Sequence, residues 1–190
     1  MNTEILRPLT TVEVDTYHRD GVLLLKNMFD KDWIELLNKG LDVNCESPTE
    51  RSRIWDKDDL GHIMFYDTLA WKEIEEYKKF IFNSPAAQIC GQLMKSTTVN
   101  FFFDAVFVRS AGTKFETPWH QDEPYWSIEG YDACTLWMPL VPVKEKNCLS
   151  FVPGSHLFKS VFNQKNFSEL TGNPKDNVDF SKVADQEFPD

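Results

Sequence analysis

The pattern of apolar residues changes near residue 96, and this change limits the fold more than any other feature of the chain. Before it, apolar residues recur at helical spacing, and four of them share one face of segment 31–41: Trp33, Ile34, Leu37 and Leu41. After it, apolar and β-branched runs typical of strands occupy residues 97–108, 133–141 and 148–152. Helices that come first and strands that follow predict an α+β fold with a β-sandwich or barrel core.

Capping signals mark the first two helices. Thr10 and Glu13 have the spacing of a capping box, and Gly21 is suited to end that helix. Asp30 precedes the second helix. Between them, the apolar residues 22–25 are predicted to form a short buried strand.

Two further helices are predicted after a polar loop at residues 44–62. An apolar stripe at helical spacing occupies residues 71–81. Ser84 and Pro85 then start a short helix that ends near Lys95. The first half of the chain is therefore expected to be mostly helical.

Composition excludes several classes of protein. A length of 190 residues favours a single domain over 1–190. Thirty acidic and 20 basic residues give a net charge of −10, so binding to nucleic acid or to an anionic membrane surface is not expected. The sequence has no apolar run long enough for a bilayer and no recognisable secretion signal, so a cytoplasmic protein is expected.

The four cysteines, Cys45, Cys90, Cys134 and Cys148, form no CxxC pair, which excludes the usual zinc-knuckle and thioredoxin motifs. In a cytoplasmic chain they are expected to be free thiols. Cys134 and Cys148 fall on neighbouring β-like runs, so these two are expected to approach each other most closely.

The residues best suited to chemistry are His120 and Asp122, in segment 117–126. On an extended chain, residues two apart point to the same face, so the imidazole and the carboxylate could bind one metal ion. Such a pair is two-thirds of the facial triad of non-haem Fe(II) oxygenases. The same spacing also suits an exposed polar turn. Ten aromatic residues between Phe101 and Trp137 favour an apolar cavity around the pair, although such residues also fill ordinary cores.

Several motifs together resemble the phytanoyl-CoA dioxygenase family. They are YHRDGVLLL at residues 17–25, TPWHQD at 117–122, CTLW at 134–137 and NCLSFVPGSH at 147–156. The resemblance covers residues 10–160 and implies a double-stranded β-helix, also called a jelly roll or cupin-like barrel, flanked by N-terminal helices. It also implies Fe(II) as cofactor, 2-oxoglutarate as cosubstrate, and O2-dependent hydroxylation of a small organic substrate.

Carried over residue by residue, the resemblance makes His120 and Asp122 the first two iron ligands. Trp137 would line the 2-oxoglutarate pocket. Arg109 stands where the family usually has a Lys, and it could steer the anionic cosubstrate, although an Arg at a strand end is also commonly a solvated charge. The carboxylate of Asp122 implies hydroxylation rather than halogenation, because related halogenases leave this position empty for chloride.

The resemblance also points to missing parts. In the family the distal iron-binding His and a 2-oxoglutarate-binding Arg follow the P-G-S-H turn, whose own His is structural. This chain has no His after His156 and no Arg after Arg109. The domain is therefore expected to be C-terminally incomplete and to lack the last strands of its barrel, which exposes strand edges and promotes self-association. A non-catalytic barrel that binds a metal or a small molecule without turnover is the alternative to an active oxygenase.

Overall fold

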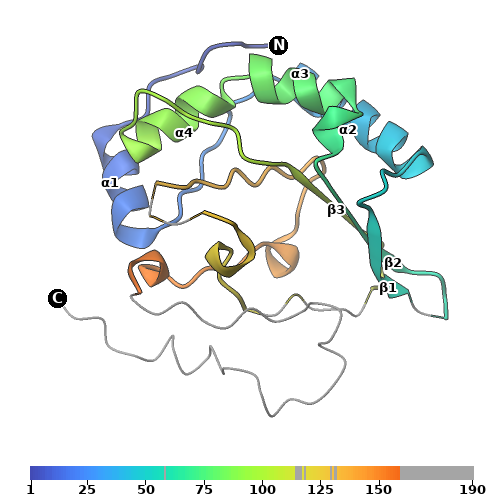
Figure 1. Cartoon of the computed structure of the whole chain (residues 1–190). Coiled ribbons are helices and arrows are strands. Elements are labelled where there is room, and N and C mark those ends of the chain that lie inside the picture. Colours follow the sequence, from blue (N-terminus) through green and yellow to red (C-terminus); the bar gives the residue numbers. More distant parts are fainter. Residues whose placement is uncertain (58, 114–116, 118, 129, 131, 159–190) are drawn as a thin grey trace.

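The structure is a computed structural model that describes residues 1–57, 59–113, 117, 119–128, 130 and 132–158. Its helices are α1 (Thr11–Asp20), α2 (Lys31–Glu46), α3 (Glu75–Asn83) and α4 (Ala86–Met94). Its strands are β1 (Arg53–Lys57), β2 (Ile63–Thr68) and β3 (Ala105–Arg109). Short 3-10 helices are η1 (Ala70–Lys72), η2 (Glu123–Tyr125), η3 (Glu145–Asn147) and η4 (Ser155–Leu157). Figure 1 shows the helices as one layer, the sheet beyond the end of that layer, and the later part of the chain beneath it.

Helix α1 begins and ends as predicted. The Thr10 side chain accepts a hydrogen bond from the N–H of Glu13, and the Glu13 carboxylate accepts one from the N–H of Thr10 at 2.8 Å. Arg7 contacts the same carboxylate, and its hydrogen bonds together with those from Thr10 lower the pKa of Glu13 to about 2. Gly21 ends the helix with a φ of 74°, a left-handed conformation that glycine adopts without steric cost.

The main core lies between α2, α3 and η1. Its fully buried members are Leu37, Ala70, Ile74 and Tyr77. Partly buried residues from more distant segments close it: Trp71, Phe80, Val106, Met138 and Leu140. On α2, Trp33 is also buried, and its indole N–H donates to the carbonyl of Asn2 at 2.7 Å. The predicted apolar face of this helix is therefore confirmed.

A second cluster joins α4 to the N-terminal segment. Met28 packs with Ile89 and Leu93 of α4, and Leu23 and Leu25 lie against them. Residues 22–25 were predicted as a strand, and this prediction is wrong, because the structure gives them no regular secondary structure. Side-chain packing on α4, rather than a backbone ladder, holds this apolar run in place.

The sheet is antiparallel, with the strand order β1-β2-β3. In its register, Tyr66 of β2 faces Phe107 of β3, and Met64 faces Arg109. Val106 packs into the main core, so neighbouring Phe107 points to the opposite face of the sheet, away from the helices. Arg109, two residues further on, lies on that same face. The predicted polar loop at 44–62 is wrong in part, since it contains the end of α2 and the edge strand β1, whose polar composition suits an exposed edge.

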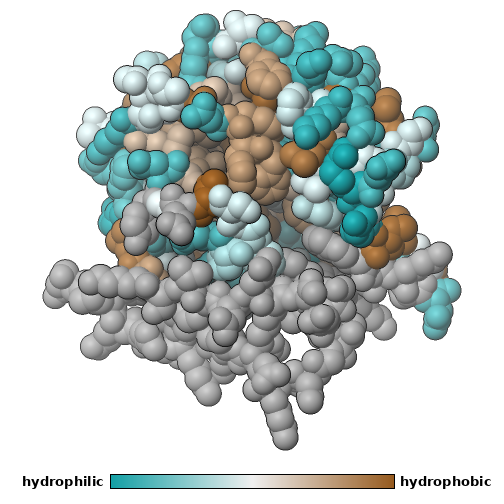
Figure 2. All heavy atoms as spheres, in the orientation of Figure 1, coloured by the Kyte–Doolittle hydropathy of each residue, from teal (hydrophilic) through white to brown (hydrophobic). Residues whose placement is uncertain are grey.

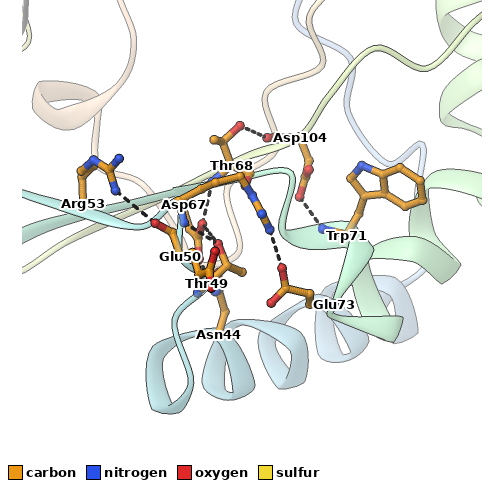
Figure 3. A network of polar contacts seen from close by, with 10 residues as sticks. Asn44, Thr49, Glu50, Arg53, Asp67, Thr68, Trp71, Glu73 and Asp104 are labelled. Carbon is orange, nitrogen blue, oxygen red and sulfur yellow. Dashed lines mark hydrogen bonds and ion pairs between the residues drawn. The ribbon is translucent and has the colours of Figure 1, made fainter.

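A buried polar network ties the end of α2 to the sheet (Figure 3). The Asp67 carboxylate, fully buried, accepts hydrogen bonds from the Asn44 side chain at 2.8 Å, from the Thr49 hydroxyl at 2.6 Å and from the N–H groups of Thr49 and Thr68. Burial raises the pKa of this carboxyl, but the four bonds outweigh it and hold the pKa below its ordinary value. Nearby, Arg51 donates to the Thr68 carbonyl at 2.9 Å and pairs with Glu73.

The second half of the chain differs from its prediction. Of residues 97–108, only the end lies in a strand, and neither 133–141 nor 148–152 forms one. Pro139 and Pro142 lack the N–H that a ladder requires, and the carbonyl of Leu140 accepts instead from the side chain of Asn38 at 3.2 Å. The described residues thus combine helices with one three-stranded antiparallel sheet, and a closed jelly roll is not seen among them.

Within this described part of the chain, no helix combines the length and the apolar character needed to cross a lipid bilayer.

Candidate functional site

His120 and Asp122 come together as the sequence predicts. The Nε2 atom of His120 lies 3.2 Å from Oδ1 of Asp122. The reason differs from the predicted one, because this segment is not a strand. Asp122 adopts a helical conformation (φ −76°, ψ −35°) and begins η2, so a turn rather than strand alternation swings its carboxylate toward the imidazole.

The turn also places an aromatic ring beside His120 and begins a second aromatic contact one residue further on. The ring of Tyr125 stands edge-on to that of His120, with centroids 6.2 Å apart. The ring of Trp126 packs against the rings of Phe102 and Phe103, which precede β3, and its centroid is 6.4 Å from each of theirs. Of the aromatic surroundings that the sequence predicted, the structure shows the ring of Tyr125 against His120, and an apolar cavity around the pair stays a prediction. Sequence analysis had not singled out Tyr125, because its spacing of five residues from His120 becomes a contact only through η2.

Arg109 links this segment to the sheet. Its guanidinium donates to the hydroxyl of Thr117 at 2.9 Å and lies 3.5 Å from the sulfur of Met64 on β2. Thr117 stands three residues before His120, so this contact attaches the start of the segment that carries the His120–Asp122 pair to β3. A cation at this place suits an anionic ligand.

Trp137 lies on the segment that passes beneath the helices. Its neighbours Met138 and Leu140 pack into the main core, whereas Trp137 itself is 48% exposed. Its predicted place in a cosubstrate pocket stays a prediction. Figure 2 shows apolar surface gathered in the middle of the displayed face, between hydrophilic residues on either side.

The geometry of the pair fits two neighbouring ligands of one metal ion. Two ligand atoms at right angles around an ion, each with a bond of about 2.1 Å, stand about 3.0 Å apart. The 3.2 Å between His120 Nε2 and Asp122 Oδ1 is close to that value. Among the described residues, no three His, Cys, Asp or Glu side chains are grouped so as to hold a metal. The described residues therefore bring two side chains of ligand type together here, and their binding of a metal stays a prediction.

His156 serves a structural purpose, as predicted. Its Nε2–H donates to the carbonyl of His18 at 3.0 Å, and the N–H of Gly154 donates to the carbonyl of Asp20 at 2.9 Å. The P-G-S-H turn is thus attached to the end of α1. The hydrogen-bond partner of His156 comes from the other end of the chain, a contact that sequence spacing does not reveal.

The cysteines are all free, as predicted. The side chains that act on the pKa of the Cys134 thiol are those of Cys90 on α4 and of Tyr17, and Cys148 is not among them. Hydrogen bonds from Cys90 and Tyr17 lower the pKa of the Cys134 thiol, and the hydrogen bond with Cys134 together with burial raises that of Cys90. The spacing of these residues along the sequence carries no signal for this effect.

An open groove of about 630 Å³ lies elsewhere, between the N-terminal residues, α2 and α3, with Trp33, Glu75 and Phe82 among its walls. None of the residues discussed above as possible ligands for a metal or cosubstrate lines it.

Comparison with known families decides the relationship. The model of the phytanoyl-CoA dioxygenase family (PhyH) matches residues 17–178, most of the chain. The chain belongs to this family. The phytanoyl-CoA dioxygenase family is cupin-like in fold, and its members depend on Fe(II) and 2-oxoglutarate. No curated protein and no solved structure matches the chain significantly.

Proposed function

We propose that this member of the phytanoyl-CoA dioxygenase family contributes to an Fe(II)/2-oxoglutarate-dependent hydroxylation of a small organic substrate. The observation that carries the proposal is the 3.2 Å approach of His120 Nε2 to Asp122 Oδ1, which fits two neighbouring ligands of one ion. In this proposal the sheet β1-β2-β3 is part of a jelly roll, and 1–190 is a single domain. The cytoplasmic location and self-association expected from the sequence stay predictions.

Each residue has a separate role in the proposed reaction. His120 and Asp122 hold the metal, which when bound supplies activation of O2 coupled to decarboxylation of 2-oxoglutarate. The Arg109 guanidinium attracts and orients the dianionic cosubstrate, and Thr117 keeps that guanidinium in position at 2.9 Å. Trp137 contributes an apolar wall against which the cosubstrate packs. Tyr125, edge-on to the imidazole, limits rotation of the His120 ring.

Metal binding tests the proposal directly. Fe(II) and 2-oxoglutarate are added together under anaerobic conditions, and the metal-to-ligand charge-transfer band is followed. We expect the band with the unaltered chain and its loss in His120→Ala and in Asp122→Asn. Glu123→Gln is the matched control, because it removes a neighbouring exposed carboxylate and should keep the band. A band that survives both ligand substitutions would exclude this pair as the iron site.

The alternative is a barrel that binds without turnover. It is favoured by the two-ligand site, since a facial triad uses three protein ligands. The two functions differ in succinate formation from 2-oxoglutarate with Fe(II), ascorbate and O2. Turnover that disappears in Asp122→Asn supports the oxygenase. Saturable metal binding with no succinate supports the alternative.

A further inference from the structure

We propose that the boundary between the helix layer and the sheet is a binding site for ordered internal water, which hydrogen-bonds to the side chains of Asn44, Trp71, Tyr77 and Asp104. The site is separate from the candidate metal ligands and depends on neither a metal nor 2-oxoglutarate.

The proposal begins from four buried polar atoms that have no hydrogen-bond partner among the described residues: Asn44 Oδ1, Trp71 Nε1, the Tyr77 hydroxyl and Asp104 Oδ1. Asn44 is 0% exposed and Tyr77 is 5% exposed, so bulk solvent does not reach these side chains. In folded proteins the large majority of buried polar side-chain atoms are hydrogen-bonded, either to protein or to ordered water. Four exceptions in one part of the fold therefore indicate a bound partner that is not protein.

The sheet brings two of these residues to the boundary. The Asn44 amide donates to the Asp67 carboxylate at 2.8 Å, and Asp67 pairs with Val106 in the register of β2 and β3. Asp104 stands two residues before Val106, and its carbonyl still bonds to the end of β2, so both side chains point to the helix-facing side of the sheet. There, Asp104 Oδ2 accepts from the N–H of Trp71 at 3.1 Å (Figure 3).

The helices supply the other side of the boundary. Tyr77 of α3 belongs to the main core, on which Val106 packs. A Cβ atom on Gly40 would stand 2.9 Å from Cε1 of the Tyr77 ring, and Gly40 lies about one helical turn before Asn44 on α2. Burial raises the pKa of the Tyr77 hydroxyl, and the charge of Asp104 raises it further. This hydroxyl therefore keeps its proton and can donate it in a hydrogen bond.

The chemistry of the four atoms suits water better than a metal ion. Trp71 Nε1–H can only donate, the amide oxygen of Asn44 can only accept, and the Tyr77 hydroxyl can do both. Water donates two hydrogen bonds and accepts two, so it satisfies both kinds of atom, and internal water in proteins makes about three such bonds. The positive end of the indole N–H would repel a cation. Burial raises the pKa of Asp104, which further disfavours the charge that a cation would need.

A crystal structure of the full chain tests the site directly. We expect ordered water density at hydrogen-bond distance, about 2.7–3.2 Å, from at least two of the four atoms. The proposal is overturned if fewer than two of the atoms contact water, whether because the space is empty or because protein groups bond to them instead.

Magnetic relaxation dispersion of water oxygen tests the site in solution, because a water molecule held for longer than the tumbling time of the protein adds to the dispersion. Tyr77→Phe removes a donor and keeps the ring against Gly40, so we expect its amplitude to fall by about one water molecule. Tyr66→Phe is the matched control, because that ring lies beside Phe107 on the opposite face of the sheet and its loss should leave the amplitude unchanged.

A second variant, Asp104→Leu, removes an acceptor and fills the space with an apolar side chain. It should lower the amplitude as Tyr77→Phe does, so the test does not depend on the folding of one variant. Amplitudes that stay equal to that of the unaltered chain in the folded variants would overturn the site.

A metal ion at this place would give a different pattern. Sodium, potassium, magnesium or calcium, compared at constant ionic strength, would then raise the melting temperature of the unaltered chain more than that of Tyr77→Phe. We expect the two chains to respond equally to every cation, because water needs none of them. A rise that one cation gives only in the unaltered chain would overturn water as the ligand.

Discussion

Gly21 and His156 lie against each other, although one is near the start of the described chain and the other is near its end. A Cβ atom on Gly21 would stand 2.7 Å from Cγ of the His156 ring, and the same ring donates to the carbonyl of His18. Gly21 also has a φ of 74°. The glycine that ends α1 therefore leaves the space into which the P-G-S-H turn inserts its imidazole, and two motifs of the sequence become parts of one contact.

Gly21→Ala should destabilise the chain by about 2–4 kcal/mol, from a left-handed alanine together with a clash against a ring fixed by its own hydrogen bond. Gly61→Ala is the control, because Gly61 has a similar φ of 81° and no atom near its missing Cβ, so only the backbone cost of about 1 kcal/mol applies. Urea denaturation measures both. Equal losses in the two variants would mean that the contact with His156 contributes nothing.

Asp67→Asn should lower the free energy of unfolding at neutral pH by about 2–4 kcal/mol, since an amide cannot accept all four of the hydrogen bonds that the buried carboxylate receives. The folded pKa of Asp67 lies below its ordinary 3.8. Its contribution is therefore complete above about pH 3.8 and is lost as the pH falls through the folded value. The difference between the two chains should shrink in acid. Asp42→Asn, an exposed site on α2, should change the free energy of unfolding little at any pH.

Asp104 should show the opposite dependence on pH. Burial raises the pKa of this carboxyl above 3.8 in the folded chain, while one oxygen accepts from the N–H of Trp71 at 3.1 Å. Ionisation therefore reduces stability as the pH rises from 3.8 through the raised folded value. Asp104→Asn keeps an acceptor for Trp71 and cannot ionise. In acid, we expect the free energy of unfolding of Asp104→Asn to lie within about 1 kcal/mol of that of the unaltered chain. As the pH rises to neutral, the variant should become more stable relative to the unaltered chain. Denaturation curves at a series of pH values measure the trend, and a difference that does not change with pH would contradict it.

Arg109→Met should weaken 2-oxoglutarate binding about tenfold or more, because it removes charge-assisted hydrogen bonds to a carboxylate. Arg53→Met, on the edge strand β1, removes an equal charge and should leave the affinity unchanged. Calorimetric titration of the metal-loaded chain measures both. If both variants lose affinity equally, Arg109 acts only through the overall charge.

Self-association should increase with salt. Large apolar residues are exposed in the second half of the chain, among them Phe107, Trp119, Trp137 and Phe151. A net charge of −10 opposes contact between copies, and salt screens that repulsion while leaving apolar contacts in place. Sedimentation velocity from 20 mM to 500 mM salt, roughly a fivefold change in screening length, should show a growing larger species. A distribution that stays monomeric throughout would contradict the prediction.

Local signals in the sequence were enough to place the helices and their caps. The Thr10–Glu13 capping box and the helical spacing of Trp33 and Leu37 act within a few residues, so the sequence alone contains their physical cause. Asp30 stands at the N-cap of α2 as predicted, although its side chain makes no capping hydrogen bond. The approach of His120 to Asp122 is equally local, although the turn that produces it was not foreseen.

Contacts between distant segments could be decided only by the tertiary structure. Residues 22–25 and 133–141 have apolar patterns that suit a strand, but a strand needs a partner backbone, and here side-chain packing and the Asn38 bond to Leu140 take its place. The meeting of Asn38 with Leu140, and of Gly21 with His156, follows from how the helices pack on the later chain. Such pairs leave no periodic pattern, because each depends on the path of the whole chain rather than on its neighbours in sequence.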